Sequence, residues 1–455
     1  MKRFPVALLR SLAVGLTLAS GFSALAQYTD PVVIRDLGGV EEFSRRRQEL
    51  AKQLKTGYLM LLARIALPEA NHYREDNDFF YYTGLSDPGA ILVMDVAKAT
   101  TFIFEPQQSP RVKQVYGSNL LSMTADEQEK LGYKTVLPLS ALDNLLAFML
   151  GKETDLWLRL TYPDKADGAR FEVGGHDYAD QYANPYGDPT PGDRAALKKL
   201  AERYPAAHQK DATASIDGMR NLKTPQEIAV LRRNGRLSAD GIRLAIAHAK
   251  PPIYEYQIEA RADYVFRDGG AQGWAYPAIV SSAEHINTWH YFNDRRQIQA
   301  DELVVFDFAA DLDHMTMDIT RTFNSSGKFT PEQAKWYQVD LESQKAVIAL
   351  LRPGNTYEQA SDSGKAVFEK NGEAKQWPGF PGHFVGLATH DVLLPRGPIK
   401  TGQVVTVEPI LEFSDKQMHF RVEDTILITD QGPEILSSGV PKEMTDVEKL
   451  VGSEK

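Results

Sequence analysis

Four carboxylates in the second half of the chain lie in segments that otherwise have the composition of buried β-strands. They are Asp307, Asp318, Glu408 and Glu423, within residues 304–308, 315–320, 404–408 and 420–426. A buried carboxylate is costly unless it is paired or bound to a metal ion. Any one of these acids could be an ordinary exposed side chain on a solvated sheet face, but their recurrence in four apolar segments makes the set a candidate for metal chemistry.

The spacing of the first two acids predicts a close pair. If residues 304–311 and 314–321 form an antiparallel hairpin that turns at Leu312-Asp313, Asp307 lies directly opposite Asp318. Opposite residues in such a hairpin have Cβ atoms about 4.5–5.5 Å apart. Two like charges at that distance are unstable unless they are protonated or neutralised.

A second hairpin, turning at Asp415-Lys416, would place Glu408 opposite Glu423 in the same way. The charge of four carboxylates is balanced by two divalent cations, and metal ions about 3.5–4 Å apart form hydrolytic centres in many enzymes. The sequence therefore predicts a dinuclear metal site.

Histidines add a second type of ligand to this half of the chain, because seven of the ten follow residue 215. His383 and His390 lie in a glycine-containing segment, 382–391, where the backbone can approach a ligand closely. They are seven residues apart, so on a single strand they would face opposite sides, and we do not assume that both bind metal. A carboxylate-rich set with imidazole favours Mn²⁺, with Co²⁺, Zn²⁺ or Fe²⁺ as alternatives.

The first 26 residues have the pattern of a bacterial signal peptide. Lys2, Arg3 and Arg10 precede an apolar run that closes with Ala24-Leu25-Ala26, which is a typical cleavage pattern. A membrane anchor is the alternative, but residues 11–26 are shorter than the roughly 20 needed to span a bilayer. We therefore expect an exported protein, periplasmic or secreted, with no membrane attachment after cleavage.

The composition excludes several classes of function. The chain has 455 residues, 43% of them hydrophobic and 25% charged, which is typical of a globular protein with more than one domain. The net charge of −10 makes nucleic acid an unfavourable partner. The chain has no cysteine, which rules out disulfides, thiol nucleophiles and cysteine-bound zinc.

The elements that must position these residues fall into two domains. Alternating helix and strand patterns predict a mixed α/β domain over residues 27–214, with an amphipathic helix at 40–55 and strands at 58–62, 91–94 and 101–104. Thr224-Pro225-Gln226-Glu227 then predicts the start of a long helix, so residues 215–455 form the second domain. Residues 163–194 are rich in Tyr, Asp, Gly and Pro. We interpret them as a plain surface connection, with a functional lid as the alternative.

In this order the acids and His383 resemble the ligands of the pita-bread metallopeptidases, family M24, which include methionine aminopeptidase, Xaa-Pro aminopeptidase and prolidase. The matching motifs are Asp318–Phe323, Gly382–Asp391, Thr406–Pro409 and Arg421–Thr425. Residues 76–85 with Pro88 are also similar to the N-terminal domain of Xaa-Pro aminopeptidases and prolidases. Methionine aminopeptidase has no such domain, so the resemblance implies an α/β (α+β) chain with an N-terminal aminopeptidase P-like domain and a pita-bread catalytic domain.

The resemblance assigns the metal ligands. It implies that Asp307 binds one metal ion, that Asp318 and Glu423 bridge both, and that His383 and Glu408 hold the other. The nucleophile would be a bridging water or hydroxide.

The resemblance also assigns the remaining catalytic residues. Glu408 would carry the proton to the leaving nitrogen, His390 would hold the scissile carbonyl, and His290 would be a third active-site histidine. Arg421 would orient the bridging carboxylates. Ile410, Glu412 and residues 379–382 depart from the family's usual pattern, which puts the preferred substrate length and side chain in doubt but leaves the metal ligands intact.

The function implied is that of an exported metallo-aminopeptidase, a hydrolase that releases the first residue from peptides with proline in the second position. Prolidase, which takes dipeptides, is the alternative, because it shares every motif quoted. A creatinase-like amidinohydrolase and a non-catalytic peptide-binding module on the same fold are more remote alternatives. The resemblance further implies a homodimer or a homotetramer.

Overall fold

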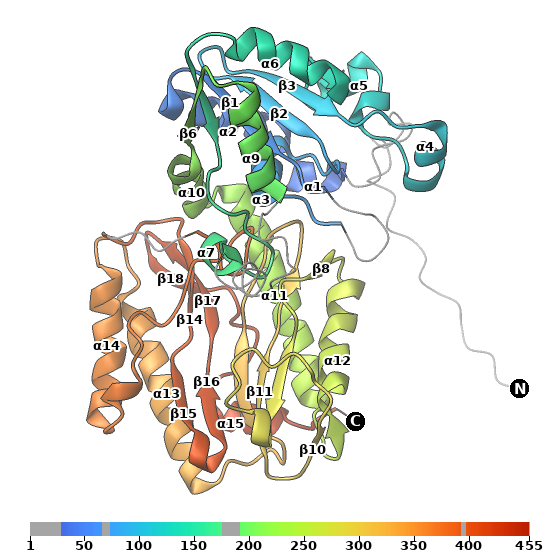
Figure 1. Cartoon of the computed structure of the whole chain (residues 1–455). Coiled ribbons are helices and arrows are strands. Elements are labelled where there is room, and N and C mark those ends of the chain that lie inside the picture. The colour runs from blue at the N-terminus through green and yellow to red at the C-terminus, as the bar shows by residue number, and fades with distance from the viewer. Residues whose placement is uncertain (1–28, 66–72, 175–191, 393–396, 455) are drawn as a thin grey trace, which may run out of the picture.

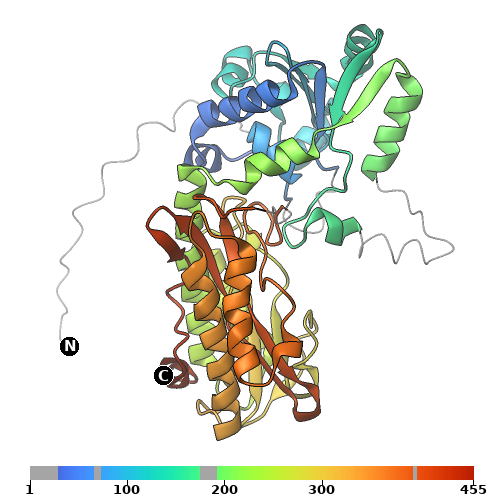
Figure 2. The same cartoon turned by 90° about the vertical axis from the view of Figure 1, so that its left-hand side faces the viewer.

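The computed structural model describes residues 29–65, 73–174, 192–392 and 397–454. The predicted signal peptide, 1–26, and residues 175–191 of the predicted connection lie outside these ranges. Figure 1 shows two domains stacked end to end, the first above the second, and Figure 2 shows the same arrangement from the side. Within the described ranges we find no helix with the length and apolar character needed to cross a membrane.

The first domain is built on a six-stranded mixed sheet with the strand order β4-β3-β2-β1-β5-β6. The strands are β1 (Tyr58–Leu62), β2 (Ile91–Asp95), β3 (Thr100–Glu105), β4 (Val136–Pro138), β5 (Thr154–Leu158) and β6 (Ala207–Asp211). The α-helices are α1 (Pro31–Asp36), α2 (Gly39–Leu54), α3 (Asn77–Thr83), α4 (Pro110–Tyr116), α5 (Ala125–Lys130), α6 (Leu142–Leu150), α7 (Arg170–Glu172), α9 (Gly192–Arg203) and α10 (Thr213–Asn221). The predicted helix and the three predicted strands are confirmed as α2, β1, β2 and β3.

In the second domain two pairs of packed helices flank the strands, as Figure 1 shows. They are α11 (Pro225–His248) with α12 (Glu255–Asp268), and α13 (Pro331–Leu350) with α14 (Tyr357–Lys370). The predicted start of α11 is confirmed. The Thr224 hydroxyl accepts from the backbone of Glu227, and the Glu227 side chain accepts from the backbone of Thr224. A short helix, α15 (Met444–Leu450), closes the chain.

The strands of the second domain form two three-stranded sheets and a hairpin. The sheet β13-β11-β9 contains β9 (Ile279–Ser282), β11 (Leu303–Asp307) and β13 (Thr320–Asn324). The sheet β14-β17-β18 contains β14 (Val404–Val407), β17 (Asp424–Thr429) and β18 (Gly432–Ile435), and the hairpin contains β15 (Ile410–Phe413) and β16 (Met418–Arg421). Two small ladders pair β7 (Ile253–Tyr254) with β10 (Gln297–Ile298), and β8 (Gly273–Trp274) with β12 (Ala310–Asp311).

The predicted register of the first hairpin is wrong by two residues. Asp307 pairs with Thr320 and not with Asp318. The cause is the turn, which is centred on Asp313 and His314, both at positive φ, inside a bridge between Leu312 and Met315. A two-residue type I′ hairpin turn, whose backbone twist matches that of the flanking strands, requires positive φ at both central residues. A shift of two residues leaves each side chain on the same face of the hairpin. Asp307 and Asp318 therefore still lie on one face.

The predicted register of the second hairpin is confirmed. Ile410 pairs with Arg421 in the β15–β16 ladder, and Val407 pairs with Asp424 in the β14–β17 ladder. Both ladders keep the same register on either side of a short interruption. Glu408 and Glu423 lie within that interruption, so their carboxylates are not fixed within a regular ladder.

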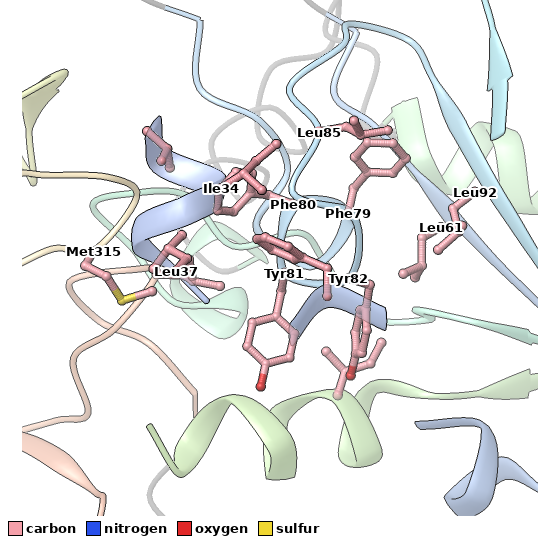
Figure 3. Packing of buried hydrophobic residues seen from close by; sticks show 14 of the residues in the cluster. Ile34, Leu37, Leu61, Phe79, Phe80, Tyr81, Tyr82, Leu85, Leu92 and Met315 are labelled. Atoms are coloured by element: carbon pink, nitrogen blue, oxygen red, sulfur yellow. The ribbon is translucent and has the colours of Figure 1, made fainter. Parts of the chain in front are cut away.

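The two domains share a hydrophobic core, part of which Figure 3 shows. All seven residues of α3 are buried. The Phe80 ring stacks on His314, with ring centroids 3.7 Å apart, and Met315 belongs to the same buried cluster. The 76–85 motif therefore packs the first domain onto the turn between β11 and β13, close to the strand ends that carry Asp307 and Asp318.

Candidate active site

The five predicted metal ligands converge where the strands of the second domain end. Their ligand atoms fall into three-residue groups, and within each group these atoms lie within 4.8 Å of one another. The groups are Asp307, Asp318 and Glu423; His383, Glu408 and Glu423; and Asp318, His383 and His390. The first two groups share Glu423, and Asp318 belongs to the first and the third. This sharing is what two adjacent cations with bridging carboxylates require.

The donor atoms of the cluster fit metal ions. Asp318 Oδ1, Glu423 Oε1 and His383 Nε2 are buried and make no hydrogen bond within the described residues. His383 Nε2 lies 3.3 Å from Asp318 Oδ2 and 3.2 Å from Glu408 Oε1. Buried polar atoms are normally hydrogen-bonded. Three neighbouring carboxylate and imidazole atoms without a hydrogen bond therefore favour a cation site. Hard carboxylate oxygens with one imidazole suit Mn²⁺, Co²⁺, Zn²⁺ or Fe²⁺.

Asp307 is held from both sides. Tyr276 Oη donates to Asp307 Oδ1 at 2.5 Å, and Arg421 Nη2 donates to Asp307 Oδ2 at 2.7 Å. Arg421 was predicted to orient the bridging carboxylates, but its hydrogen bond is to Asp307, the acid assigned to a single metal ion. Tyr276 has no signal in the sequence, because no spacing relates a residue 31 positions upstream to Asp307.

Threonine hydroxyls orient two of the other acids. Thr320 Oγ1 donates to Glu423 Oε2 at 2.6 Å, and Thr406 Oγ1 donates to Glu408 Oε1 at 3.3 Å. Thr406 lies two residues before Glu408. Strand alternation places residues i and i+2 on one face, so this spacing is a signal from which the hydroxyl beside Glu408 could have been found.

The electrostatics of the cluster reflect an excess of negative charge. Burial raises the pKa of Asp307 to about 7, although the Arg421 guanidinium opposes the shift. Burial, together with the charges of Asp318 and Glu408, raises the pKa of Glu423 well above its ordinary value. One arginine is therefore insufficient to hold the pKa values of Asp307 and Glu423 in their ordinary range.

His383 contributes a charge of the opposite sign to the cluster. Burial alone would lower the pKa of its imidazole, but the negative charges of the adjacent Asp318 and Glu408 carboxylates outweigh burial and raise the pKa well above its ordinary value. His383 thus acts as a partial counter-charge for the acids. Divalent cations would take over that role and leave the imidazole neutral, which is the form that binds metal.

The segment that carries both histidines runs beside β14. Thr406 N donates to His383 O at 2.8 Å. A Cβ at Gly382 would lie 2.2 Å from Thr406 O, so this close approach requires glycine. Residues 383–392 form no regular strand, and the rings of His383 and His390 lie 3.9 Å apart between centroids. The condition of a single strand is therefore not met, and strand alternation does not separate the two rings.

A cavity of about 600 Å³ opens onto the cluster. Glu408, His390 and Arg421 line it, and His290 lines it from an exposed position, with its ring stacked on Phe292 at 5.7 Å between centroids. Of the positions that depart from the family's pattern, Phe380, Pro381, Gly382 and Ile410 also belong to its wall. All four predicted catalytic side chains thus border one cavity.

The first domain supplies another part of that wall. Residues 165, 167–168 and 172–173 line the cavity, and His390 Nδ1 lies 2.6 Å from Glu172 Oε1. The interpretation of 163–194 as a plain surface connection was therefore wrong for residues 163–174. Nothing in the local composition of this segment indicates a contact with a residue 218 positions away.

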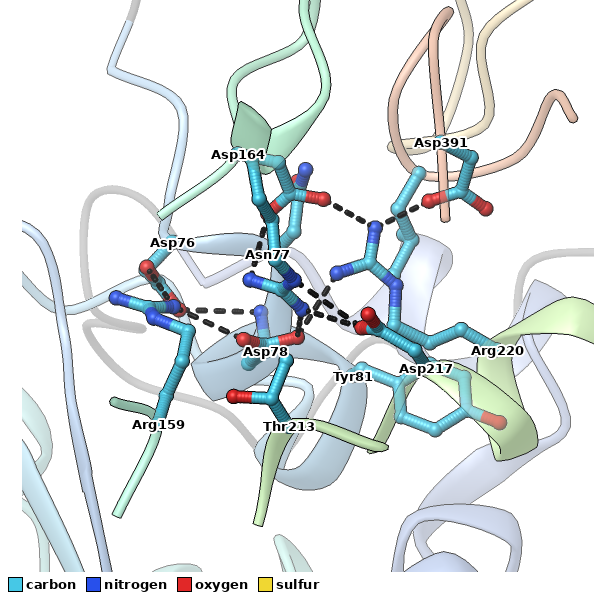
Figure 4. Close-up of polar contacts among 12 residues, drawn as sticks. Asp76, Asn77, Asp78, Tyr81, Arg159, Asp164, Thr213, Asp217, Arg220 and Asp391 are labelled. Atoms are coloured by element: carbon cyan, nitrogen blue, oxygen red, sulfur yellow. Dashed lines mark hydrogen bonds and ion pairs between the residues drawn. The ribbon is translucent and has the colours of Figure 1, made fainter. Parts of the chain in front are cut away.

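A buried ionic cluster joins the two domains, and Figure 4 shows the polar contacts of most of its residues. The Arg220 guanidinium donates to Asp78 at 2.8 Å and also to Asp164 and Asp391. The cluster consists of Asp76, Asp78, Arg159, Asp164, Arg170, Asp217, Arg220, Lys223 and Asp391. Asp391 follows His390 directly, so this cluster fixes the backbone next to a predicted catalytic histidine.

Two family models match the chain. The model of metallopeptidase family M24 matches residues 229–430, and the model of the aminopeptidase P N-terminal domain matches residues 43–157. The Xaa-Pro aminopeptidase of Escherichia coli (strain K12) is 29% identical over 456 residues, covering 90% of this chain and 97% of that protein. Xaa-Pro aminopeptidase 3 of Homo sapiens is 27% identical, covering 83% of this chain and 76% of that protein.

Solved structures show the same likeness. Aminopeptidase P from Escherichia coli with the inhibitor Pro-Leu aligns with a TM-score of 0.75 and 26% identity, covering 90% of this chain and 98% of that chain. Proline aminopeptidase P II from Yersinia pestis aligns with a TM-score of 0.76 and 26% identity, covering 90% and 99%. The likeness extends over both domains.

Proposed function

Because the chain belongs to the Xaa-Pro aminopeptidase family of M24 metallopeptidases, and is thus a metallo-aminopeptidase, we propose that it removes the N-terminal residue from peptides with proline in the second position. The observation that carries this proposal is the convergence of the four carboxylates and His383 on one cavity. The name of the Escherichia coli relative, which matches this chain over almost its whole length, agrees with it.

We infer that the site holds two divalent cations, with Mn²⁺ as the first candidate. Asp307 would hold one ion, His383 and Glu408 would hold the other, and Asp318 and Glu423 would be shared by both. When bound, such ions polarise a carbonyl and lower the pKa of water to near neutrality. Metal analysis of protein prepared in excess Mn²⁺ is expected to give a ratio near two per chain. Full activity at a ratio near zero would exclude this centre.

The chain's own residues supply the remaining steps. Glu408 lines the cavity with a side chain that is 20% exposed, so its carboxylate can accept a proton from water and pass it to the leaving nitrogen. This nitrogen belongs to a tertiary amide and must be protonated to leave, which makes a nearby proton carrier necessary. His390 would hold the scissile carbonyl oxygen, His290 would contact the substrate from the rim, and Arg421 keeps Asp307 in place.

Peptide length separates the aminopeptidase from the prolidase alternative. With Mn²⁺ added, we expect Ala-Pro-Ala to yield free alanine and Pro-Ala, and Ala-Ala-Ala to remain largely intact because it lacks the proline. Cleavage of Gly-Pro without cleavage of Ala-Pro-Ala would identify a dipeptidase. Cleavage of neither would refute the proposed reaction.

Export and assembly are separate proposals. The basic residues, apolar run and Ala24-Leu25-Ala26 pattern of residues 1–26 support removal of a signal peptide. Mass spectrometry of protein from the native host should then find Gln27 at the N-terminus, and an intact Met1 in a cytoplasmic fraction would contradict it. We also propose a homodimer or a homotetramer, which light scattering can distinguish from a monomer.

A further inference from the structure

Glu172 joins the first domain to a catalytic histidine of the second. His390 Nδ1 lies 2.6 Å from Glu172 Oε1, and both side chains are about one quarter exposed, at 25% and 24%. The second carboxylate oxygen of Glu172 accepts from Ala169 N at 2.8 Å. Both oxygens are therefore engaged, and the carboxylate has one fixed orientation toward the imidazole.

The segment that carries Glu172 is itself held rigidly. The neighbouring Arg170, buried in the ionic cluster, donates from Nη2 to Asp78 Oδ1 and to Asp217 Oδ1, at 2.8 Å each. These contacts tie the short helix α7 to α3 and α10 of the first domain. Figure 1 shows α7 at the junction of the two domains.

The histidine segment is tied to the same first-domain segment on both sides of His390. Thr389 N donates to Ala166 O at 2.7 Å. Asp391 shares the Arg220 guanidinium with Asp164. Three consecutive residues, 389–391, thus each have a partner in, or linked to, residues 164–172, which is more than a plain connection between domains would require.

A carboxylate bound to one nitrogen of an imidazole fixes the plane of the ring and determines which nitrogen faces the ligand. Because Nδ1 of His390 faces Glu172, the Nε2 edge of the ring is directed away from it. A ring nitrogen of His390 lies within 4.8 Å of ligand atoms of Asp318 and His383. The carboxylate therefore presents His390 to the part of the cavity where the scissile carbonyl would lie.

We propose that Glu172 is a positioning residue for His390, and that the first domain in this way completes the active site of the second. The proposal rests on the role given to His390 under the proposed function. It extends the set of functional residues to a segment of the first domain that has no part in metal binding.

The proposal predicts a selective loss of turnover. In Glu172→Ala, we expect kcat to fall about 10- to 100-fold, the range found for carboxylates that orient a functional imidazole, while KM and the metal content stay unchanged. Glu172→Gln keeps an oxygen acceptor and should restore part of kcat. Glu202→Ala, an exposed glutamate of α9 in the same domain, is the matched control and should behave as the wild type.

A double-mutant cycle tests whether Glu172 acts through His390. If it does, adding Glu172→Ala to His390→Ala should cause little further loss of kcat, although each single substitution is damaging. Independent, multiplicative losses would overturn the positioning role, as would a single Glu172→Ala variant with wild-type kcat. A loss of metal from Glu172→Ala would instead indicate a general disturbance of the site and would also count against the proposal.

A measurement without substrate separates this proposal from the proposed function. In protein labelled with ¹⁵N-histidine, the His390 signals are those lost in His390→Ala. Their shifts should report a proton on Nδ1 in the wild type and a changed distribution of the proton in Glu172→Ala. If no Xaa-Pro peptide is cleaved, the proposed reaction fails, but this change would still support the contact. Identical His390 spectra in the two proteins would refute it.

Discussion

Replacing Arg220 with methionine would remove the cation that joins three buried carboxylates across the two domains. The Arg220 side chain is 1% exposed, and its partners Asp78, Asp164 and Asp391 are 0%, 1% and 1% exposed. Methionine has a similar length and apolar stem, so the change removes charge and hydrogen bonds more than volume. Asp78 and Asp164 lie in the first domain, whereas Asp391 lies beside His390.

The magnitude follows from what each acid retains. Asp78 keeps Arg159 and Arg170, and Asp391 keeps Lys223 at 3.0 Å. Breaking a buried ion pair costs about 3–5 kcal/mol because a charge is left without its partner. Since each of these acids keeps another cation, we expect a loss of about 3 kcal/mol in the free energy of unfolding. Unfolding entropy is about 2.1 cal/mol/K per residue, so in a chain of 455 residues each kcal/mol shifts Tm by about 1 °C, and Tm should fall by roughly 3 °C.

Scanning calorimetry at neutral pH provides the assay. Arg232→Ala is the matched control, since Arg232 pairs with Glu434 at 2.7 Å but the two side chains are 44% and 38% exposed. An exposed pair of this kind contributes about 0–1 kcal/mol and is screened by salt. Arg220→Lys keeps the charge but loses the planar fork that reaches several acids at once, so its Tm should lie between those of the wild type and Arg220→Met.

The result that would refute this reasoning is a Tm of Arg220→Met no lower than that of Arg232→Ala. In that case the buried cluster would add no net stability to the junction of the domains. A different result would be the expected decrease in the Tm of Arg220→Met together with fully retained turnover. It would show that the cluster stabilises the junction but does not position His390.

Further predictions concern the metal site and pH. Glu423→Ala should abolish activity and reduce Mn²⁺ binding in isothermal titration, because it removes a carboxylate shared by two ligand groups; unchanged metal content would show that Glu423 does not bridge. His383→Ala should lose metal affinity, with partial rescue by excess Mn²⁺, whereas His390→Ala should keep its metal and lose about 10²–10³ in kcat; the reverse pattern would exchange their roles. Burial raises the pKa of the Glu75 carboxyl to about 8 from an ordinary 4.5. The stability tied to its proton is therefore present below about pH 4.5 and lost as pH rises through 8. The Tm advantage of Glu75→Gln should then grow from pH 5 to pH 8, and a constant difference would contradict the shift.

The sequence alone identified the candidate metal-binding carboxylates, because their signal is local. An acid within an apolar strand is conspicuous wherever the strand is placed, and strand alternation assigns it to a face. The register of the β15–β16 hairpin could be predicted since the pairing continues unchanged into β14 and β17. The first register was missed by two residues because the turn was placed one residue early, and strand propensities give no information on whether Asp313 and His314 adopt positive φ.

The tertiary structure alone determined how the ligands are supported. Tyr276 and Arg421 converge on Asp307 from different segments, and Glu172 reaches His390 across 218 residues and a domain boundary. Such contacts join residues whose spacing in the sequence follows no helix or strand periodicity. They exist because α3 packs the first domain onto the β11–β13 turn and the buried ionic cluster locks the two domains together. The local pattern of the sequence thus determined which residues could bind metal, and the packing of distant segments determined which residues hold them in place.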